Sequence, residues 1–318
     1  MFNKEQKIKF IKENYKSASS VENCLSIFNA CESFEEEWGN DLCTMDEDHI
    51  KLVLDKISGV RSNSRYIRTI TIKEYVKWCI INDIPGANDC IFKVQASGIS
   101  KIRETMVSSP IHLQKCLDEI FDAESEETID NTYRCYYWLA FSGLQESDIY
   151  KIKKSDVDFG NFEIHFSGKD YPIYRESLAS LKNSATLNSF VYKHPLYSNV
   201  ISRDRVPGSE LMRGVKAAAS WQTVRAILSK KIKLKYESKE TEVRISYHRV
   251  WMSGVFYRIY ELERAGIPVN FSAVADDFMD GKEYKLDSGR NTIESKKRQI
   301  MRDFKNDYDR WKLAYQIF

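Results

Sequence analysis

The sequence predicts a mostly helical protein with one small β-hairpin or sheet, an α+β fold arranged in two domains. A length of 318 residues is, as a prior, typical of two domains. Residues 1–103 show apolar side chains at helical spacing throughout. Residues 162–172 instead alternate apolar and polar side chains around a Gly-containing turn, which indicates paired strands. We therefore expect domains at 1–103 and 104–318.

The first domain is expected to contain several consecutive helices. Capping signals begin helices near Ser19 and Thr44, and Gly59 ends the second of these. A third helix runs from residue 62 to the Pro85-Gly86 break and carries basic side chains outside its apolar face. These basic residues, with the one that precedes the helix, are Arg61, Arg65, Arg68, Lys73 and Lys77. Residues 86–108 are expected to form a linker.

The second domain is expected to begin with an amphipathic helix over residues 111–121. An aromatic helix over 133–141 breaks at Ser142-Gly143, and a short amphipathic helix should follow with Leu144, Ile149 and Ile152 on one face. A half-buried strand over 162–166 then leads into a tight turn at 168–170.

The remaining chain is expected to be loop-like from 182 to 208 and helical afterwards. The predicted helix over 220–234 ends in a basic run, which is a pattern that contacts phosphate or forms a solvated helix end. The lysines considered for nucleic-acid binding in this run are Lys230, Lys231 and Lys233. Another helix follows residue 246, and the charged tail after residue 278 should also be helical.

Composition narrows the class of protein. Seven scattered cysteines without a C-x-x-C pair indicate buried thiols in a reducing cytoplasm, and neither a zinc site nor a disulfide framework. No apolar run approaches the ~20 residues of a membrane span, and the first residues lack the apolar core of a secretory signal. Net charge is only +2, but residues 20–60 hold ten acidic and two basic residues, whereas 61–103 hold eight basic and three acidic. This asymmetry fits one basic face and one acidic face.

The order of helix, Gly break, hairpin and helix resembles the catalytic domain of tyrosine recombinases, the phage integrase superfamily. The residues that carry the resemblance are Ser142-Gly-Leu-Gln-Glu-Ser-Asp-Ile, Lys154-Ser-Asp-Val-Asp, Gly168-Lys169 and, further on, Glu263-Arg-Ala-Gly-Ile. Residues 1–103 resemble the helical core-binding (SAM-like) domain of the same family, with Asn82-Asp-Ile-Pro as its exit. The family's first active-site arginine falls on Gln145.

The resemblance implies a site-specific recombinase or integrase of a mobile element, encoded by a bacterium or phage and associated with the nucleoid. A tyrosine attacks a DNA phosphodiester, giving a 3′-phosphotyrosine intermediate without metal or other cofactor. Arginines and a histidine stabilise the phosphorane, and a hairpin lysine protonates the leaving oxygen. The positions that match are Lys169, Arg249, His248, the degenerate Gln145, and Tyr284 as nucleophile with Tyr308 as alternative. The partners implied are double-stranded DNA and further copies of the chain.

The sequence leaves open the assignment of the second active-site box and three functions, the first of which is the active recombinase described above. The second active-site box fits only if Ser246 replaces the family's histidine with Arg249 as the arginine, or if His248 is the histidine and Trp251 stands in place of arginine. A DNA-binding relative that has lost cleavage is favoured by this box and by Gln145. A helical scaffold without DNA is the third possibility, while no acidic cluster has the spacing of a metal-dependent nuclease.

Overall fold

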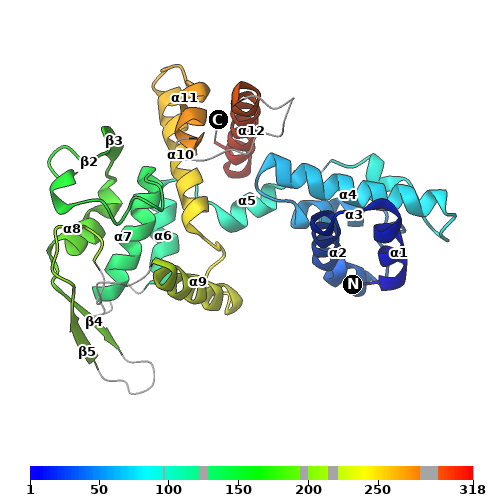
Figure 1. Cartoon of the computed structure of the whole chain (residues 1–318), viewed down its shortest axis with the longest axis horizontal. Coiled ribbons are helices and arrows are strands. Elements are labelled where there is room, and N and C mark those ends of the chain that lie inside the picture. Colours follow the sequence, from blue (N-terminus) through cyan, green and yellow to red (C-terminus); the bar gives the residue numbers. More distant parts are fainter. Residues whose placement is uncertain (96, 122–127, 194–199, 214–220, 280–292, 318) are drawn as a thin grey trace. The chain divides into compact units, whose positions relative to one another are not determined.

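The computed structural model describes residues 1–95, 97–121, 128–193, 200–213, 221–279 and 293–317. It divides into two compact units, one of residues 1–103 with 270–318 and one of residues 104–269 (Figure 1). The division after residue 103 coincides with the expected boundary, whereas residues 270–318, expected in the second domain, group with the first unit. The domain limits themselves stay a prediction.

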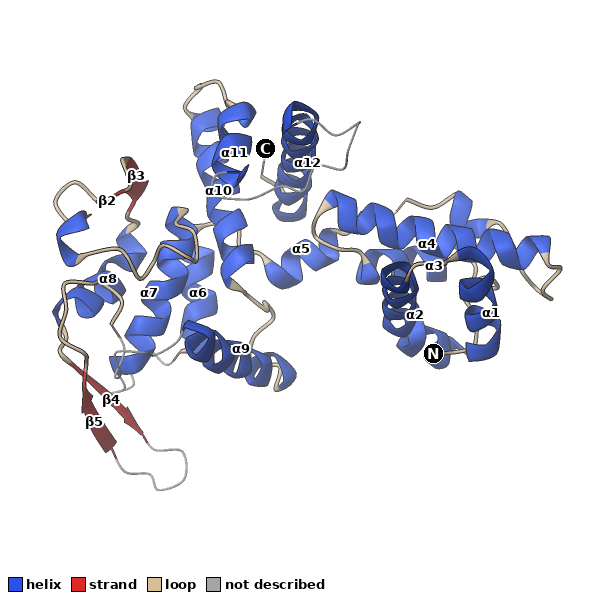
Figure 2. Cartoon of the chain, viewed as in Figure 1, coloured by secondary structure: helices blue, strands red, loops and turns tan. Residues whose placement is uncertain are grey.

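Every regular element among the described residues of the N-terminal unit is a helix, as expected (Figure 2). Its elements are α1 (Lys4–Asn14), α2 (Ala18–Trp38), α3 (Glu47–Ile57), α4 (Ser62–Ile81), the 3-10 turn η1 (Cys90–Phe92), α5 (Ile99–Thr105) at the unit boundary, α11 (Phe271–Met279) and α12 (Ile293–Tyr315). The segment 86–108, expected as a linker, thus contains two short helical elements.

Aromatic rings form the centre of this unit. Phe10, Phe28 and Tyr75 are at most 1% exposed, and their ring centroids lie 5.0 to 6.0 Å apart in edge-to-face pairs. Such pairs add about 0.5–1.5 kcal/mol each beyond the burial of apolar area. The contacts join α1, α2 and α4 into one core.

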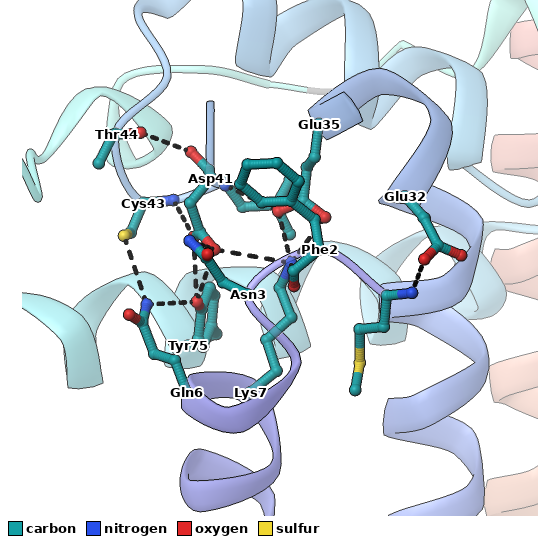
Figure 3. A network of polar contacts seen from close by, with 12 residues as sticks. Phe2, Asn3, Gln6, Lys7, Glu32, Glu35, Asp41, Cys43, Thr44 and Tyr75 are labelled. Atoms are coloured by element: carbon teal, nitrogen blue, oxygen red, sulfur yellow. Dashed lines mark hydrogen bonds and ion pairs between the residues drawn. The ribbon is translucent and has the colours of Figure 1, made fainter. Parts of the chain in front are cut away.

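A buried polar network lies beside these rings (Figure 3). The Lys7 ammonium lies 2.5 Å from Glu35 Oε1 and 3.6 Å from Asp41 Oδ2, and all three side chains are almost fully buried. The Tyr75 hydroxyl donates to Asp41 at 3.0 Å. Burial is the largest cause of a raised Glu35 pKa, about 7, against the lowering effect of Lys7. A buried charge pair of this kind fixes one arrangement of its helices, because losing either partner leaves the other uncompensated.

Helix α12 docks on the beginning of α4 within this unit. The buried Asp307 carboxylate accepts hydrogen bonds from the backbone N–H of Ser62 at 2.8 Å and from its hydroxyl at 2.6 Å. Arg310 donates to the carbonyls of Val60 at 2.7 Å and Ser97 at 2.9 Å. Asp307 therefore satisfies an orphan donor at the start of α4, a role usually taken by the helix's own capping residue.

The C-terminal unit carries every strand that the described residues contain (Figure 2). Its elements are α6 (Pro110–Ile120), α7 (Thr128–Ser142), η2 (Lys154–Asp156), β1 (Val157–Asp158), β2 (Glu163–Phe166), β3 (Lys169–Pro172), η3 (Arg175–Ser177), α8 (Leu178–Thr186), β4 (Ser189–Lys193), β5 (Val200–Asp204), α9 (Trp221–Glu237) and α10 (Tyr247–Arg264). Strands β1, β2 and β3 form one antiparallel sheet, and β4 pairs with β5 in a separate hairpin. A mostly helical fold with a small antiparallel sheet is thereby confirmed.

Helices α7 and α10 form the core of this unit, and they cross at Gly254. A Cβ at this glycine would lie 1.9 Å from the backbone oxygen of Phe141, so only glycine permits the observed approach. Trp138, Phe141 and Phe256 are fully buried around the crossing. The close approach fixes the end of α7 against the first half of α10.

The chain differs from the sequence expectation after this end of α7. The expected short amphipathic helix is a series of turns, with the Asp148 N–H bonded to the Gln145 carbonyl at 3.0 Å and the Lys151 N–H bonded to the Asp148 carbonyl at 2.8 Å. Leu144, Ile149 and Ile152 are nevertheless fully buried. Apolar side chains reach a core equally well from successive turns, so their spacing did not establish a helix.

Two further expectations about strands were wrong in detail. The tight turn consists of Ser167 and Gly168, both with positive φ (53° and 75°), so Lys169 begins β3 opposite Phe166. Two consecutive positive φ values are what a two-residue hairpin of the I′ type requires. Residues 189–193 and 200–204, expected to be loop-like, form the β4–β5 hairpin.

Candidate functional site

The segment that resembles the family's first active-site box begins at the end of α7. Gly143 has a φ of 105°, and a Cβ there would meet the Arg258 guanidinium at 2.5 Å. Arg258 in turn donates to the Phe141 carbonyl at 2.9 Å. Glycine is therefore needed both for the backbone turn and for the space that the guanidinium fills.

The beginning of α10 holds this turn from the other side. The Tyr247 hydroxyl donates to the Leu144 carbonyl at 2.8 Å, and the Trp251 indole N–H donates to the Gly143 carbonyl at 2.8 Å. These two bonds place Gln145 and the residues between Tyr247 and Trp251 in neighbouring segments. The structure thus brings together the two segments expected to carry the first and second boxes.

The β2–β3 hairpin is attached to the same end of α7. The buried Ser142 hydroxyl donates to the Pro172 carbonyl at 2.6 Å, and the Ile173 N–H donates to the Phe162 carbonyl at 2.7 Å. Lys169 lies at the exposed end of this hairpin. Three segments far apart in sequence, which hold Gln145, Lys169 and His248 with Arg249, are therefore joined by hydrogen bonds at the end of one helix.

One ion pair lies beside Gln145. Glu146 accepts a hydrogen bond from the Tyr136 hydroxyl at 2.7 Å and lies 3.1 Å from the Arg225 guanidinium. Gln145, half-buried beside it, is neutral. The exposed His248 stacks on Trp251 with ring centroids 5.9 Å apart, and the half-buried Arg249 lies 3.9 Å from the Met252 sulfur.

The tyrosines packed beside these segments are poorly suited as nucleophiles. Burial, followed by the hydrogen bond with Glu146, raises the pKa of Tyr136 far above its ordinary value. Burial likewise raises the pKa of Tyr247 well above that value. Both hydroxyls remain protonated donors with fixed acceptors: Tyr136 holds the Glu146 side chain, and Tyr247 holds the backbone at Leu144. Sequence reasoning did not select Tyr136, Tyr247 or Arg258, because nothing local distinguishes them from other core residues.

The structure describes one of the two tyrosines proposed as nucleophiles. Tyr284 lies outside the described residues. Tyr308 belongs to α12 of the N-terminal unit and is 1% exposed, stacked on Trp311 with centroids 6.1 Å apart. The Lys312 ammonium lies 4.7 Å from the Tyr308 ring centroid. In this structure the Tyr308 side chain is part of the core that attaches α12.

The basic residues of α4 and its N-cap fall on two faces. Arg61, Arg65 and Arg68 recur at three- and four-residue spacing and so share one face, while Lys73 and Lys77 share another. Arg65 donates to the Ser97 carbonyl at 3.3 Å, and Arg68 donates to the Ile57 carbonyl at the end of α3. All five residues are half-buried or exposed. Their contact with DNA stays a prediction.

The basic run on α9 is partly engaged inside the C-terminal unit. Lys231 lies 2.5 Å from the buried Asp130 carboxylate and 5.4 Å from the Phe121 ring centroid. Lys233 is paired with Glu237 at 3.6 Å on the exposed surface, and Lys230 is exposed. Lys231 therefore attaches α9 to the rest of the unit, and a DNA contact from this run also stays a prediction.

One group in the described part of the chain has the spacing of metal ligands. Ligand atoms of Glu163, His165 and Asp170 on the β2–β3 hairpin lie within 4.8 Å of one another. His165 Nδ1 lies 2.7 Å from Asp170 Oδ1, and this hydrogen bond is the largest cause that raises the pKa of His165. The exposed pair satisfies itself as a cross-strand ion pair.

Comparison with known proteins gives one family model that matches the N-terminal residues. Residues 1–81 match the family model described as MrpR, N-terminal core-binding domain. Two solved structures of the Tn1549 transposon integrase in complex with circular intermediate DNA are similar at 13% and 14% identity. They cover 93% and 94% of this chain and 98% of each integrase chain, with TM-scores of 0.31 and 0.32. No curated protein matches the sequence.

Among the described residues, none of the helices combines the length and the apolar composition needed to span a bilayer.

Proposed function

We propose that this chain, whose residues 1–81 form a core-binding domain of the integrase type, binds duplex DNA as a homo-oligomer and has lost efficient strand cleavage. The C-terminal unit would keep the arrangement of segments that forms a strand-transfer site and would bind a DNA backbone there without cleaving it. The proposal combines the matched family of the N-terminal domain with the chemistry of the segments around Gln145.

One observation carries the loss of cleavage. The neutral Gln145 stands where the family has an arginine, in a turn that Trp251 and Tyr247 hold through the carbonyls of Gly143 and Leu144. If His248 is the family's histidine, Trp251 also occupies the second arginine position. Its indole N–H is already used by the Gly143 carbonyl, so it has no donor left for a phosphate oxygen.

The energetic consequence is large. Removing one preorganised donor from the oxygens of a transition state costs about 3 kcal/mol, which is a rate loss of roughly a hundredfold. A glutamine retains one hydrogen bond but no charge, and a charge-assisted bond is about twice as strong as a neutral one. Two such losses together would lower the cleavage rate by roughly ten-thousandfold.

A second candidate keeps the enzyme active. Arg225 lies 3.1 Å from Glu146, so a guanidinium is present next to the neutral position. If Arg225 stands in for the missing arginine, then Lys169, Arg249 and His248 would complete the site and Tyr284 would attack. On this alternative, Gln145→Arg raises cleavage, because it returns charge to a site that is only weakened.

The experiment begins by selecting a bound duplex from a random library with the full chain. That duplex is then synthesised with a nick near the centre, so that any cleaved strand is lost and a covalent adduct accumulates. We expect retention of the duplex on native gels and no adduct on denaturing gels. An adduct mapped to Tyr284 or Tyr308 would refute the loss of cleavage, and failure to select any duplex would refute DNA binding.

A further inference from the structure

The N-terminal unit contains a pocket of about 440 Å³. It opens between α2, the first two turns of α4 and the first half of α12. Its polar lining includes Arg61, Asn63 and Arg68 at the start of α4, and Lys296, Gln299 and Asp303 on α12. The volume lies in the range of small-molecule sites, about 300–1,000 Å³.

The lining favours an anion. Three cationic side chains, Arg61, Arg68 and Lys296, face the pocket together with one carboxylate, Asp303. The amides of Asn63 and Gln299 add neutral donors. The pocket also lies near the beginning of α4, where the Asp307 carboxylate already accepts from the N–H and hydroxyl of Ser62, so the attraction for an anion comes from the three cationic side chains. Guanidinium groups, which can donate two hydrogen bonds at once, and a lysine ammonium are the side-chain groups that recognise phosphate in proteins.

The walls of the pocket are fixed before any ligand arrives. Asp307 holds the beginning of α4 through the N–H and hydroxyl of Ser62, and Arg310 holds the preceding carbonyl of Val60. Phe304, 1% exposed, anchors the same stretch of α12. These contacts order the backbone that carries the side chains of the pocket. Binding therefore needs to order only the side chains, and the loss of backbone conformational entropy is small.

We propose that this pocket binds a phosphate group through Lys296 of α12 and Arg61 and Arg68 at the start of α4. The phosphate comes from a free phosphorylated small molecule or from a DNA backbone, and only the second source rests on the proposed function. Because the ligand contacts both α4 and α12, its binding stabilises the docked position of α12.

The test measures inorganic phosphate binding to the full chain by calorimetry, with chloride at matched ionic strength as reference. We expect Lys296→Gln to weaken phosphate binding by about tenfold, the typical loss of one charge-assisted contact. Lys305→Gln, the same change at an exposed α12 position outside the pocket, should leave it unchanged. Asp303→Asn should tighten binding, because it removes a carboxylate that lines the pocket and repels the anion.

Two results would overturn the proposal. One is a phosphate response no larger than that of chloride; the other is equal loss in Lys296→Gln and Lys305→Gln. The opposite sign expected for Asp303→Asn separates a binding effect from misfolding. A duplex that competes with phosphate identifies the backbone as the source, and a duplex that binds without competing excludes the backbone as the source. A chain that binds phosphate but no duplex retains the pocket and refutes only the proposed DNA function.

Discussion

Replacing Gly254 by alanine tests the crossing on which the candidate site depends. The added Cβ would lie 1.9 Å from the Phe141 oxygen and 2.6 Å from its carbonyl carbon. A carbon–oxygen contact normally measures about 3.3 Å or more, so α7 and α10 must separate by roughly 1.4 Å. Both clashing groups are backbone, and no side-chain rotation relieves them. We expect a loss of about 3 kcal/mol, the upper end of the usual cost of overpacking.

The measurement is calorimetric unfolding of the full chain with hydrogen exchange of the α7 and α10 amides. For a unit of this size, 1 kcal/mol corresponds to a shift of about 2–4 °C, so the transition of the C-terminal unit should fall by about 6–12 °C. Gly160→Ala is the matched control, because its Cβ would meet only the exposed Asp158 carboxylate at 3.2 Å. A Gly254→Ala protein that unfolds within 2 °C of the wild type, with unchanged exchange, would refute the reasoning.

Two further predictions concern buried charge. Lys231→Met removes the ammonium that lies 2.5 Å from the buried Asp130 carboxylate and should destabilise the C-terminal unit by about 2 kcal/mol in denaturant unfolding. Lys233→Met, at an exposed pair, should change the stability by less than about 0.5 kcal/mol, and equal effects of the two variants would contradict the structural role of Lys231. Burial raises the pKa of Glu35 to about 7, so the folded state binds more protons than the unfolded state between about pH 4.5 and 7, and the stability of the N-terminal unit should fall as pH rises through this window. Glu35→Gln should remove that pH dependence, and a wild type whose stability rises from pH 5 to 7 would contradict the sign.

The sequence predicted helices well where apolar spacing and a stop signal agreed. α3 ends just before Gly59, and α4 ends before Pro85-Gly86, because both signals are local. The family resemblance also located the segments around Gln145, Lys169 and Arg249, which the structure joins at the end of α7. Their roles in chemistry stay a prediction.

The remaining features depend on contacts between distant residues. The turns after Gly143 carry apolar residues at helical spacing, yet the bonds from Tyr247 and Trp251 hold them as turns. Lys231 reads as part of a basic surface run, and only its contact with Asp130, a hundred residues earlier, shows its structural role. Asp307 caps a helix 245 positions away in sequence. No local pattern contains such information, because tertiary partners decide it.

The central claim, binding to a duplex backbone, is tested most directly by the salt dependence of affinity. Fluorescence anisotropy with a labelled duplex of arbitrary sequence suffices, because phosphate contacts need no target. If Arg61, Arg65, Arg68, Lys73 and Lys77 all contact phosphates, the logarithm of the association constant should fall with the logarithm of salt concentration at a slope of about −4.5. Absence of binding at low salt, or a slope near zero, would contradict the account.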